Sequence, residues 1–285
     1  MDIKGFLKTQ RLPLAYADTA QKWFIPLCER LLEHQKGAKK TFIVGINGSQ
    51  GSGKSTLTAF IAAYLESVHN KNVVALSIDD FYFDKAHRGE LSSHVHPLLA
   101  TRGVPGTHDI SLALDTINAL QSAQSVAVPR FNKATDNPFP TAQWPLVDGP
   151  ADVVILEGWC VGIKPQIPSQ LNAPVNSLEE TEDPLGIWRN FVNTELASTY
   201  QTLFSLIDYQ VMLKAPSFDC VFNWRLEQED KLRAATEGES TGIMSESEIA
   251  RFIQHYQRLT EHALETLPDS CDTVFTLDEN RAITS

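Results

Sequence analysis

The chain has 285 residues, of which 42% are hydrophobic, and it carries a formal net charge of −11. That length and composition are sufficient for a full core in one large α/β domain, or in one domain with appendages. The negative charge disfavours sequence-independent binding to nucleic acid, because most of the surface would repel a polyanion.

Two further features of the composition bear on location and partners. The first twenty residues lack the apolar stretch of a secretory signal, and no later apolar run is long enough to cross a bilayer. The cysteines are too far apart to form a CxxC pair or a disulfide framework: Cys28, Cys160, Cys220 and Cys271. We expect a soluble, cytoplasmic protein with reduced thiols and no obligate protein, membrane or nucleic-acid partner.

The N-terminal region has helical spacing. Trp23, Phe24, Leu27 and Leu31 can share one apolar face of a helix over residues 18–36. We expect residues 1–40 to form a helical extension packed outside a sheet, and residues 41–285 to form the main domain.

Short β-branched segments then alternate with helical ones. Such segments occur at residues 41–46, 72–78, 125–131, 152–158, 209–215 and 273–277. This alternation predicts an α/β fold with a mostly parallel sheet and helices on both faces. Prolines are frequent at residues 136–150 and 164–184, which we expect to be loops.

The segment GSQGSGKS at residues 48–55 follows the first predicted strand and precedes a predicted helix. Its glycines allow a tight turn whose N–H groups bind phosphate, and the helix dipole adds to that attraction. The fold is therefore predicted to be a three-layer P-loop NTPase. The residues expected to bind ATP are Gly48, Ser49, Gln50, Gly51, Ser52, Gly53, Lys54, Ser55 and Thr56.

Acidic residues follow two of the predicted strands. Asp79 and Asp80 come after residues 72–78, and Glu157 ends the strand at residues 152–158. A carboxylate at the carboxyl edge of a parallel sheet can orient an acceptor hydroxyl and take its proton, and we assign that task to Asp79. We expect Ser55, Glu157 and Asp79 to surround Mg²⁺, with Glu157 acting through water.

A guanine-reading NKxD element is absent. Its lookalike, at residues 132–136, has one residue too many between asparagine and aspartate. This spacing favours a kinase over a GTPase.

These elements together resemble the phosphoribulokinase, uridine kinase and pantothenate kinase group, and that resemblance implies that Asp79 is the base. Four more segments are similar to D-glycerate 3-kinases of the plant and fungal type and their bacterial relatives. They are PGTHD at 105–109, PRFNK at 129–133, NWRLEQE at 223–229 and GIMSESEIARFIQHY at 242–256. In that family PRF is usually followed by Asp-Lys and a serine, whereas this chain has Asn132, Lys133 and Ala134.

Cationic or protonatable residues in the middle of the chain suit an acceptor that bears a carboxylate. The residues expected to contact the acceptor are Asp80, Tyr82, Arg102, His108, Arg130 and Lys133. Each of the cations taken alone can equally be an ordinary surface charge.

The helical stretch at residues 218–235 carries Arg225, Lys231 and Arg233, and resembles a kinase lid, placed over residues 217–242. Arg225 is expected to stabilise the charge on the transferred phosphoryl group. A final helix over residues 245–267, with Ser245 as N-cap and Glu248 in a capping box, is assigned a structural role.

The predicted reaction moves the γ-phosphoryl group of MgATP to a hydroxyl of a small metabolite, with D-glycerate or a related hydroxy acid as first choice. Lys54 and the loop amides hold phosphate, and Asp79, Lys54 and Arg225 are the catalytic residues. A nucleoside or pantothenate-like acceptor remains an alternative. A nucleotide-binding regulatory module without transfer activity is another.

Overall fold

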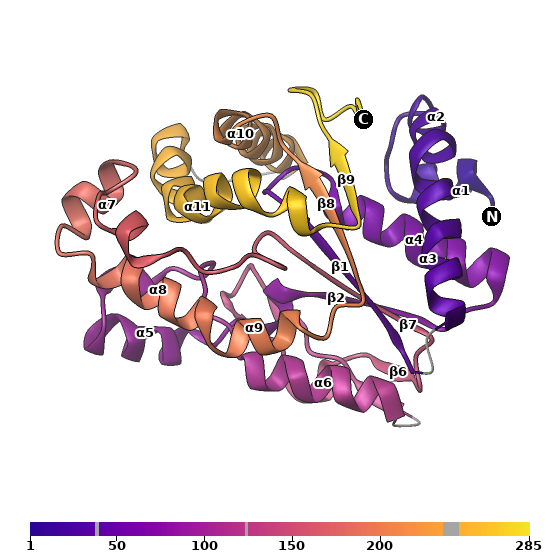
Figure 1. The fold of residues 1–285 in the computed structure, drawn as a ribbon, viewed down its shortest axis with the longest axis horizontal. Coiled ribbons are helices and arrows are strands. Elements are labelled where there is room, and N and C mark those ends of the chain that lie inside the picture. Colours follow the sequence, from indigo (N-terminus) through magenta and orange to yellow (C-terminus); the bar gives the residue numbers. More distant parts are fainter. Residues whose placement is uncertain (38–39, 123–124, 236–244) are drawn as a thin grey trace.

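The computed structural model describes residues 1–37, 40–122, 125–235 and 245–285, with the side chains of residues 228–235 outside that description. Its centre is a five-stranded sheet in the order β2-β7-β1-β8-β9 (Figure 1). Every neighbouring pair in this sheet is parallel. The strands are β1 (Phe42–Gly48), β2 (Val73–Ser77), β7 (Val153–Gly158), β8 (Tyr209–Lys214) and β9 (Thr273–Thr276).

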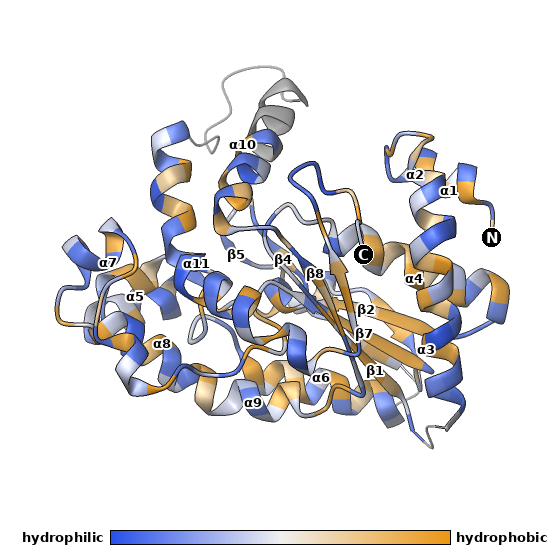
Figure 2. Cartoon of the chain, turned by 45° about the horizontal axis from the view of Figure 1, so that its top comes forward, coloured by the Kyte–Doolittle hydropathy of each residue, from blue (hydrophilic) through white to orange (hydrophobic). Residues whose placement is uncertain are grey.

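Two buried clusters cover the two faces of the sheet. In β7 all six residues are buried, and they alternate between the clusters: Val153 and Ile155 face one, Val154 and Leu156 the other. Period-two alternation with apolar residues on both faces is what a covered parallel strand requires. Figure 2 shows β1, β2 and β7 as apolar ribbons at the centre of the molecule. The predicted three-layer α/β fold is confirmed.

The helices lie on both sides of these strands (Figure 1). One face is covered by α3 (Ile25–Gly37) and α4 (Lys54–His69), and the other by α6 (Ile110–Ser122), α8 (Ile187–Ala197), α9 (Thr199–Phe204) and α11 (Glu246–Thr266). The remaining helices are α1 (Ile3–Thr9), α2 (Tyr16–Thr19), α5 (Lys85–His94), α7 (Ser177–Glu182) and α10 (Phe218–Ala235).

The predicted N-terminal helix is present as a continuous stretch. It begins with α2, passes through a π-helical turn at Ala20–Phe24 and continues as α3. Phe24 packs on Phe60 of α4, with their ring centroids 5.4 Å apart. Leu27 and Leu31 are buried in the same cluster as the sheet residues Val44 and Ile46. The division of the chain at residue 40 stays a prediction.

One predicted strand of the main sheet is wrong. Residues 125–131 do not join the parallel sheet: β3 (Ser125–Ala127) pairs antiparallel with β6 (Leu146–Asp148). Only Val126 of β3 is buried, because this ribbon lies at the surface with one covered face. A second antiparallel pair joins β4 (Phe131–Asn132) to β5 (Asn137–Pro138). The strands β5 and β6 lie in the 136–150 region expected to be a loop, and α7 lies in the 164–184 region.

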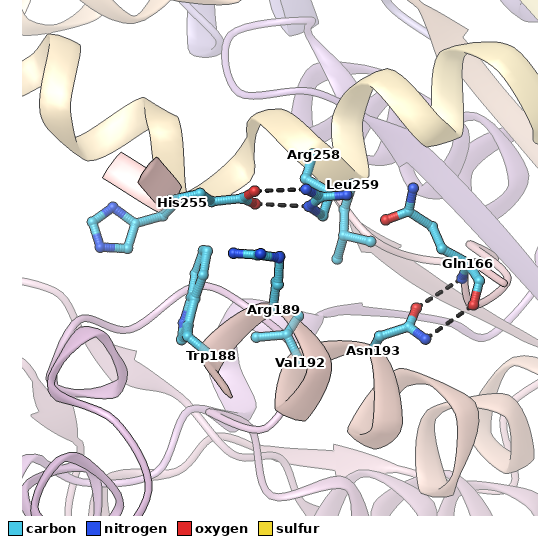
Figure 3. A pocket seen from close by; sticks show the side chains of 9 residues that line it. Gln166, Trp188, Arg189, Val192, Asn193, His255, Arg258 and Leu259 are labelled. Carbon is cyan, nitrogen blue, oxygen red and sulfur yellow. Dashed lines mark hydrogen bonds and ion pairs between the residues drawn. The ribbon is translucent and has the colours of Figure 1, made fainter. Parts of the chain in front are cut away.

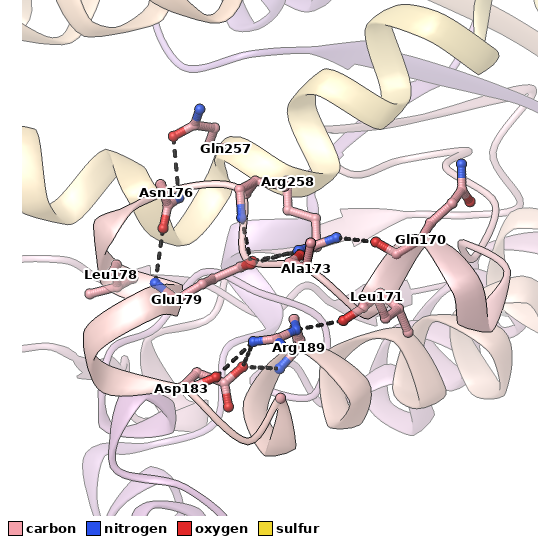
Figure 4. A network of polar contacts seen from close by, with 12 residues as sticks. Gln170, Leu171, Ala173, Asn176, Leu178, Glu179, Asp183, Arg189, Gln257 and Arg258 are labelled. Carbon is pink, nitrogen blue, oxygen red and sulfur yellow. Dashed lines mark hydrogen bonds and ion pairs between the residues drawn. The ribbon is translucent and has the colours of Figure 1, made fainter.

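A buried ionic network fixes α11 to α7 and α8 (Figure 4). Arg258 of α11 donates to both oxygens of Glu179, at 2.7 and 2.6 Å, and to the carbonyls of Gln170 and Ala173. Arg189 of α8 is paired with Asp183 at 3.0 Å. These charges are hydrogen-bonded in several directions, which is what makes their burial tolerable.

This network predicts that two ion pairs, both joining α7 to α11, differ greatly in their contribution to the free energy of unfolding. Glu179 is 0% exposed, whereas Glu182 and its partner Arg251 are 39% and 52% exposed. Glu179→Ala leaves Arg258 buried and unpaired, and should lower the free energy of unfolding by ~3–5 kcal/mol. The matched variant Glu182→Ala should cost under ~1 kcal/mol. Urea denaturation measures both, and equal effects would contradict the assignment of Glu179 as a buried anchor.

Candidate active site

The phosphate-binding loop connects the end of β1 to the start of α4. Gly51 and Gly53 have φ values of 80° and 95°, a left-handed conformation that other residues rarely adopt. Gly51 also lies against another helix, because a Cβ placed on it would be 2.7 Å from Cβ of Trp224. The backbone therefore needs glycine at this position both for its conformation and for this contact with α10.

The loop opens onto a cavity of about 350 Å³ at the carboxyl edge of the sheet. The phosphate-binding loop and the ends of β2 and β7 contribute to its lining, and α10 and α11 contribute further side chains. Its lining residues are Gln50, Gly51, Lys54, Ser55, Ser77, Asp79, Tyr82, Arg102, Lys133, Glu157, Trp159, Arg225, Phe252 and Tyr256.

Glu157 and Ser55 meet in the lining of this cavity. Glu157 lies in register with Ile46 of β1 and Ser77 of β2. The Ser55 hydroxyl donates to Oε1 of Glu157 at 2.9 Å. Oε2 of Glu157 is buried and has no hydrogen-bond partner among the described residues. A hydroxyl and a buried carboxylate with a spare oxygen suit Mg²⁺, which binds few protein oxygens and completes its shell with phosphate and water.

Asp79 lies in a 3₁₀ turn (Ile78–Phe81) directly after β2. Both of its carboxylate oxygens have partners: the Tyr82 hydroxyl donates to Oδ1 at 2.9 Å, and the Lys133 ammonium donates to Oδ2 at 2.7 Å. Burial alone would raise its pKa, but the neighbouring Lys133, together with Lys54, lowers the pKa to about 2. Asp79 is therefore ionised and held in a fixed orientation toward the cavity.

Asp80 faces a different way from its neighbour. It accepts the backbone N–H of Phe131 at 3.1 Å and pairs with Arg130 at 3.3 Å. Neither Asp80 nor Arg130 is among the lining residues of the cavity. Consecutive residues in the turn thus point in different directions, and contact of Asp80 or Arg130 with the acceptor stays a prediction. Asp80 instead holds the start of β4, two residues before Lys133.

His108 supports Tyr82 from behind. The two rings stack with centroids 4.3 Å apart, and Nδ1 of His108 lies 2.6 Å from the Tyr200 hydroxyl. Burial lowers the pKa of His108 to about 4, so the ring is neutral near pH 7. A neutral, 3% exposed histidine that does not line the cavity cannot supply the predicted charge for a carboxylate. Its contact is with Tyr82, which in turn holds Asp79.

Arg102 and Lys133 are the two predicted acceptor cations that reach the cavity. Arg102 is paired with Asp136, which also pairs with the buried Arg88 at 2.8 Å. Lys133 is 61% exposed and extends from the turn after β4 to Asp79. Arg102 is thus held in place by an anion outside the cavity, whereas the partner of Lys133 is Asp79 itself.

Helix α10 contributes Arg225 to the cavity. The residue before it, Trp224, is buried and donates its indole N–H to the carbonyl of Glu279 at 2.7 Å. The side chains of the predicted lid residues Lys231 and Arg233, and the whole of residues 236–242, lie outside what the structure describes. The lid stays a prediction.

The sequence analysis missed three aromatic residues that line the cavity, namely Trp159, Phe252 and Tyr256. Trp159 and Tyr256 form an edge-to-face pair with centroids 4.9 Å apart. The Tyr256 hydroxyl donates to the carbonyl of Arg102 at 3.2 Å. The final helix, with its capping box at Ser245 confirmed, is therefore more than a structural element. In the sequence, a functional role for this helix was indicated only by its place in the GIMSESEIARFIQHY segment at residues 242–256.

A much smaller cavity lies between α8 and α11, and no residue of the phosphate-binding loop lines it (Figure 3). Trp188, Arg189, His255 and Arg258 are among the residues that line it, and its volume is about 10 Å³. That is space for one water molecule and not for a metabolite. We therefore place the chemistry at the 350 Å³ cavity.

The fold and the cavity define the class of protein. A phosphate-binding loop that faces an oriented carboxylate across an enclosed space, with cations around it, is the arrangement of a P-loop kinase. In agreement, residues 43–175 match the phosphoribulokinase/uridine kinase family. The chain is also 34% identical over 274 residues to the uncharacterized kinase mug58 of Schizosaccharomyces pombe, covering 88% of this chain and 94% of that protein. The chain belongs to the phosphoribulokinase/uridine kinase family, which implies that ATP is its phosphoryl donor.

Two other similar proteins carry the name D-glycerate 3-kinase. The chain is 30% identical over 235 residues to the chloroplastic D-glycerate 3-kinase of Arabidopsis thaliana, covering 79% of this chain and 48% of that protein. The solved structure of D-glycerate 3-kinase from Cryptococcus neoformans var. grubii superposes with a TM-score of 0.75 at 24% identity, covering 96% of this chain and 98% of that one. At 24% identity, this structural match shows only that the two chains share a fold.

Among the described residues, no helix combines the length and apolar character needed to span a bilayer. The cytoplasmic location stays a prediction.

The buried His108 predicts how stability depends on pH. Its pKa is about 4 in the folded state and 6.5 for an ordinary histidine, so the unfolded chain binds the proton first as pH falls. The free energy of unfolding should therefore decrease as pH falls from 6.5 toward 4. His108→Asn should make this dependence shallower, whereas His94→Asn, at the exposed end of α5, should not. Denaturant titrations at several pH values measure the slope, and an unchanged slope in His108→Asn would refute this assignment.

Proposed function

We propose that the protein transfers the γ-phosphoryl group of MgATP to a hydroxyl of a small hydroxy acid, with D-glycerate as the first choice. The observation that carries this proposal is the position of Asp79, which lines the same cavity as Lys54 and Ser55 of the phosphate-binding loop. A hydroxyl bound between them would have a base on one side and the γ-phosphate on the other.

The donor side of the reaction is assigned to the loop and to β7. The loop amides and Lys54 hold the polyphosphate, while Ser55 and Glu157 provide the oxygens that would hold Mg²⁺. When bound, Mg²⁺ neutralises charge on the phosphates. Arg225 lies on the opposite wall, where its guanidinium can stabilise charge on the group being transferred.

The acceptor side is assigned to Asp79 and the cations beside it. Lys133 and Arg102 line the cavity and can bind a carboxylate through charge-assisted hydrogen bonds. An anionic acceptor would compete with Asp79 for Lys133, which at present holds Oδ2 at 2.7 Å. Release of that oxygen would let Asp79 accept a hydrogen bond from the acceptor hydroxyl. The similarity to D-glycerate 3-kinases supports glycerate among hydroxy acids.

The first test of this function is Asp79→Asn. The variant keeps the shape of the side chain but cannot take a proton, so kcat should fall by roughly 10²–10⁴ while ATP binding is retained. Phosphoglycerate formation from D-glycerate and MgATP measures the rate, and calorimetry measures the binding. Asp115→Asn, on the exposed surface of α6, is the matched control.

The acceptor panel for this assay is D-glycerate, related hydroxy acids, nucleosides and pantothenate. If another acceptor reacts and D-glycerate does not, the choice of substrate is wrong. If no acceptor reacts and Asp79→Asn changes nothing, the chain is a nucleotide-binding module without transfer activity.

The second test concerns Lys133. Lys133→Met keeps the length of the side chain but removes its charge, and a hydrogen bond to a charged group contributes ~1.5–3 kcal/mol. The KM for D-glycerate should therefore rise by about 10–100-fold, while the KM for ATP stays near that of the parent. Lys85→Met, an exposed lysine at the start of α5, should change neither value. A rise confined to the KM for ATP would place Lys133 on the donor side instead.

A further inference from the structure

The phosphate-binding loop has a cavity on its other side as well. This second space has a volume of about 690 Å³, within the ~300–1,000 Å³ range of small-molecule pockets. Its lining includes the loop residues from Gly51 to Thr56, so the two cavities share Gly51, Lys54 and Ser55. A polyphosphate bound on the shared residues would have one end in each cavity.

The walls of this larger cavity come from the two ends of the chain. Leu12, Pro13, Ala15, Tyr16 and Thr19 form one wall, around the start of α2, and Asn280, Arg281 and Ala282 form the other, after β9. Neither wall falls within the residues that match the kinase family, which begin at residue 43 and end at residue 175.

The C-terminal wall is held in a defined shape. The carboxylate of Asp278 accepts the backbone N–H groups of Asn280 and Ala282, at 2.9 and 2.8 Å. Arg281 adopts a left-handed conformation with φ 67°, lies over the Trp224 ring at 5.8 Å and pairs with Glu227. A non-glycine residue kept in that conformation indicates that the surrounding contacts determine the shape of the turn.

The chemistry of the two walls suits a nucleoside. Leu12, Pro13 and Tyr16 offer apolar surface for the face of a base. The side-chain amide of Asn280 carries both a donor and an acceptor for the edge of a base. The groups expected for proton transfer and magnesium, Asp79 and Glu157, line only the smaller cavity.

We propose that this 690 Å³ cavity binds the nucleoside end of the nucleotide, and that the N-terminal segment at residues 12–19 forms a wall of the donor site. The inference rests on the proposed function, because it takes the nucleotide to be the phosphoryl donor. It gives the N-terminal extension a direct part in recognising that donor.

The test compares ATP with inorganic tripolyphosphate, which has the phosphates but no nucleoside. Calorimetry in MgCl₂ should show the parent binding ATP more tightly than tripolyphosphate. Thr19→Trp places a bulky side chain on the N-terminal wall and should weaken ATP binding by about tenfold or more while leaving tripolyphosphate binding within about twofold. Asp18→Trp, at the exposed neighbouring position, should change neither affinity.

A second variant tests the same cavity from its other wall. Ala282→Trp should discriminate between the two ligands in the same way, with Thr284→Trp as its exposed control. If circular dichroism shows that Thr19→Trp does not fold, Ala282→Trp alone tests the inference.

Three results would overturn the inference. The first is a parent that binds tripolyphosphate as tightly as ATP, and the second is unchanged ATP affinity in both folded tryptophan variants. The third is equal weakening of the two ligands, which would locate the damage in the phosphate-binding loop. A parent that binds neither ligand would contradict the proposed function itself.

Discussion

The parallel pairing of β1 with β7 and β8 is the constraint on which the site depends. Because neighbouring strands run in the same direction, the loop after β1 and Glu157 of β7 emerge at one edge of the sheet. The pairing of β2 with β7 brings Ser77 beside Glu157 and thereby places Asp79 at the same edge. The burial of both faces of these strands fixes their register, since a shift by one residue would exchange the side chains of the two cores.

Within that frame, several charged groups around the cavity are held by a second group. Tyr82 orients Asp79 and is itself stacked on the neutral ring of His108, while Asp80 fixes the backbone that leads to Lys133. Asp136 holds Arg102 from outside the cavity. Such support reduces the reorganisation needed when charge moves during a reaction, which is how a preorganised site lowers a barrier. The ion pair between Lys133 and Asp79 differs from these supporting contacts, because both of its members line the cavity.

The sequence was most informative where a site residue follows directly from a strand or a turn. The glycines of the loop, Glu157 and the pair Asp79 and Asp80 were located because the carboxyl edge of a parallel sheet is defined by its strands. Asp79 was singled out as the base, but the direction in which Asp80 points was not predictable, since it depends on a contact with Phe131. The burial of His108 beneath Tyr82 was not predictable for a similar reason, since it comes from the packing of α9, which places Tyr200 beside it.

The remaining errors concern segments whose role comes from distant parts of the chain. Residues 125–131 have the composition of a core strand, but their neighbour in space is β6 and one face lies at the surface. Tyr256 and Phe252 occupy ordinary core positions of an amphipathic helix, and nothing local distinguishes them from the other apolar residues of α11. The N-terminal segment lies beside the phosphate-binding loop, and both Phe6 of α1 and helix α3 pack on α4.

The contact between Gly51 and Trp224 has a mechanical consequence. The backbone of the loop lies against the Cβ and the backbone of Trp224, while the indole of this residue is hydrogen-bonded to Glu279 and lies beneath Arg281. Helix α10 is thus held on two sides at its seventh residue, Trp224. When a helix tilts about a fixed point, the residues beside that point are displaced least. We therefore expect Arg225, the next residue, to keep its position beside the phosphate-binding loop if α10 tilts.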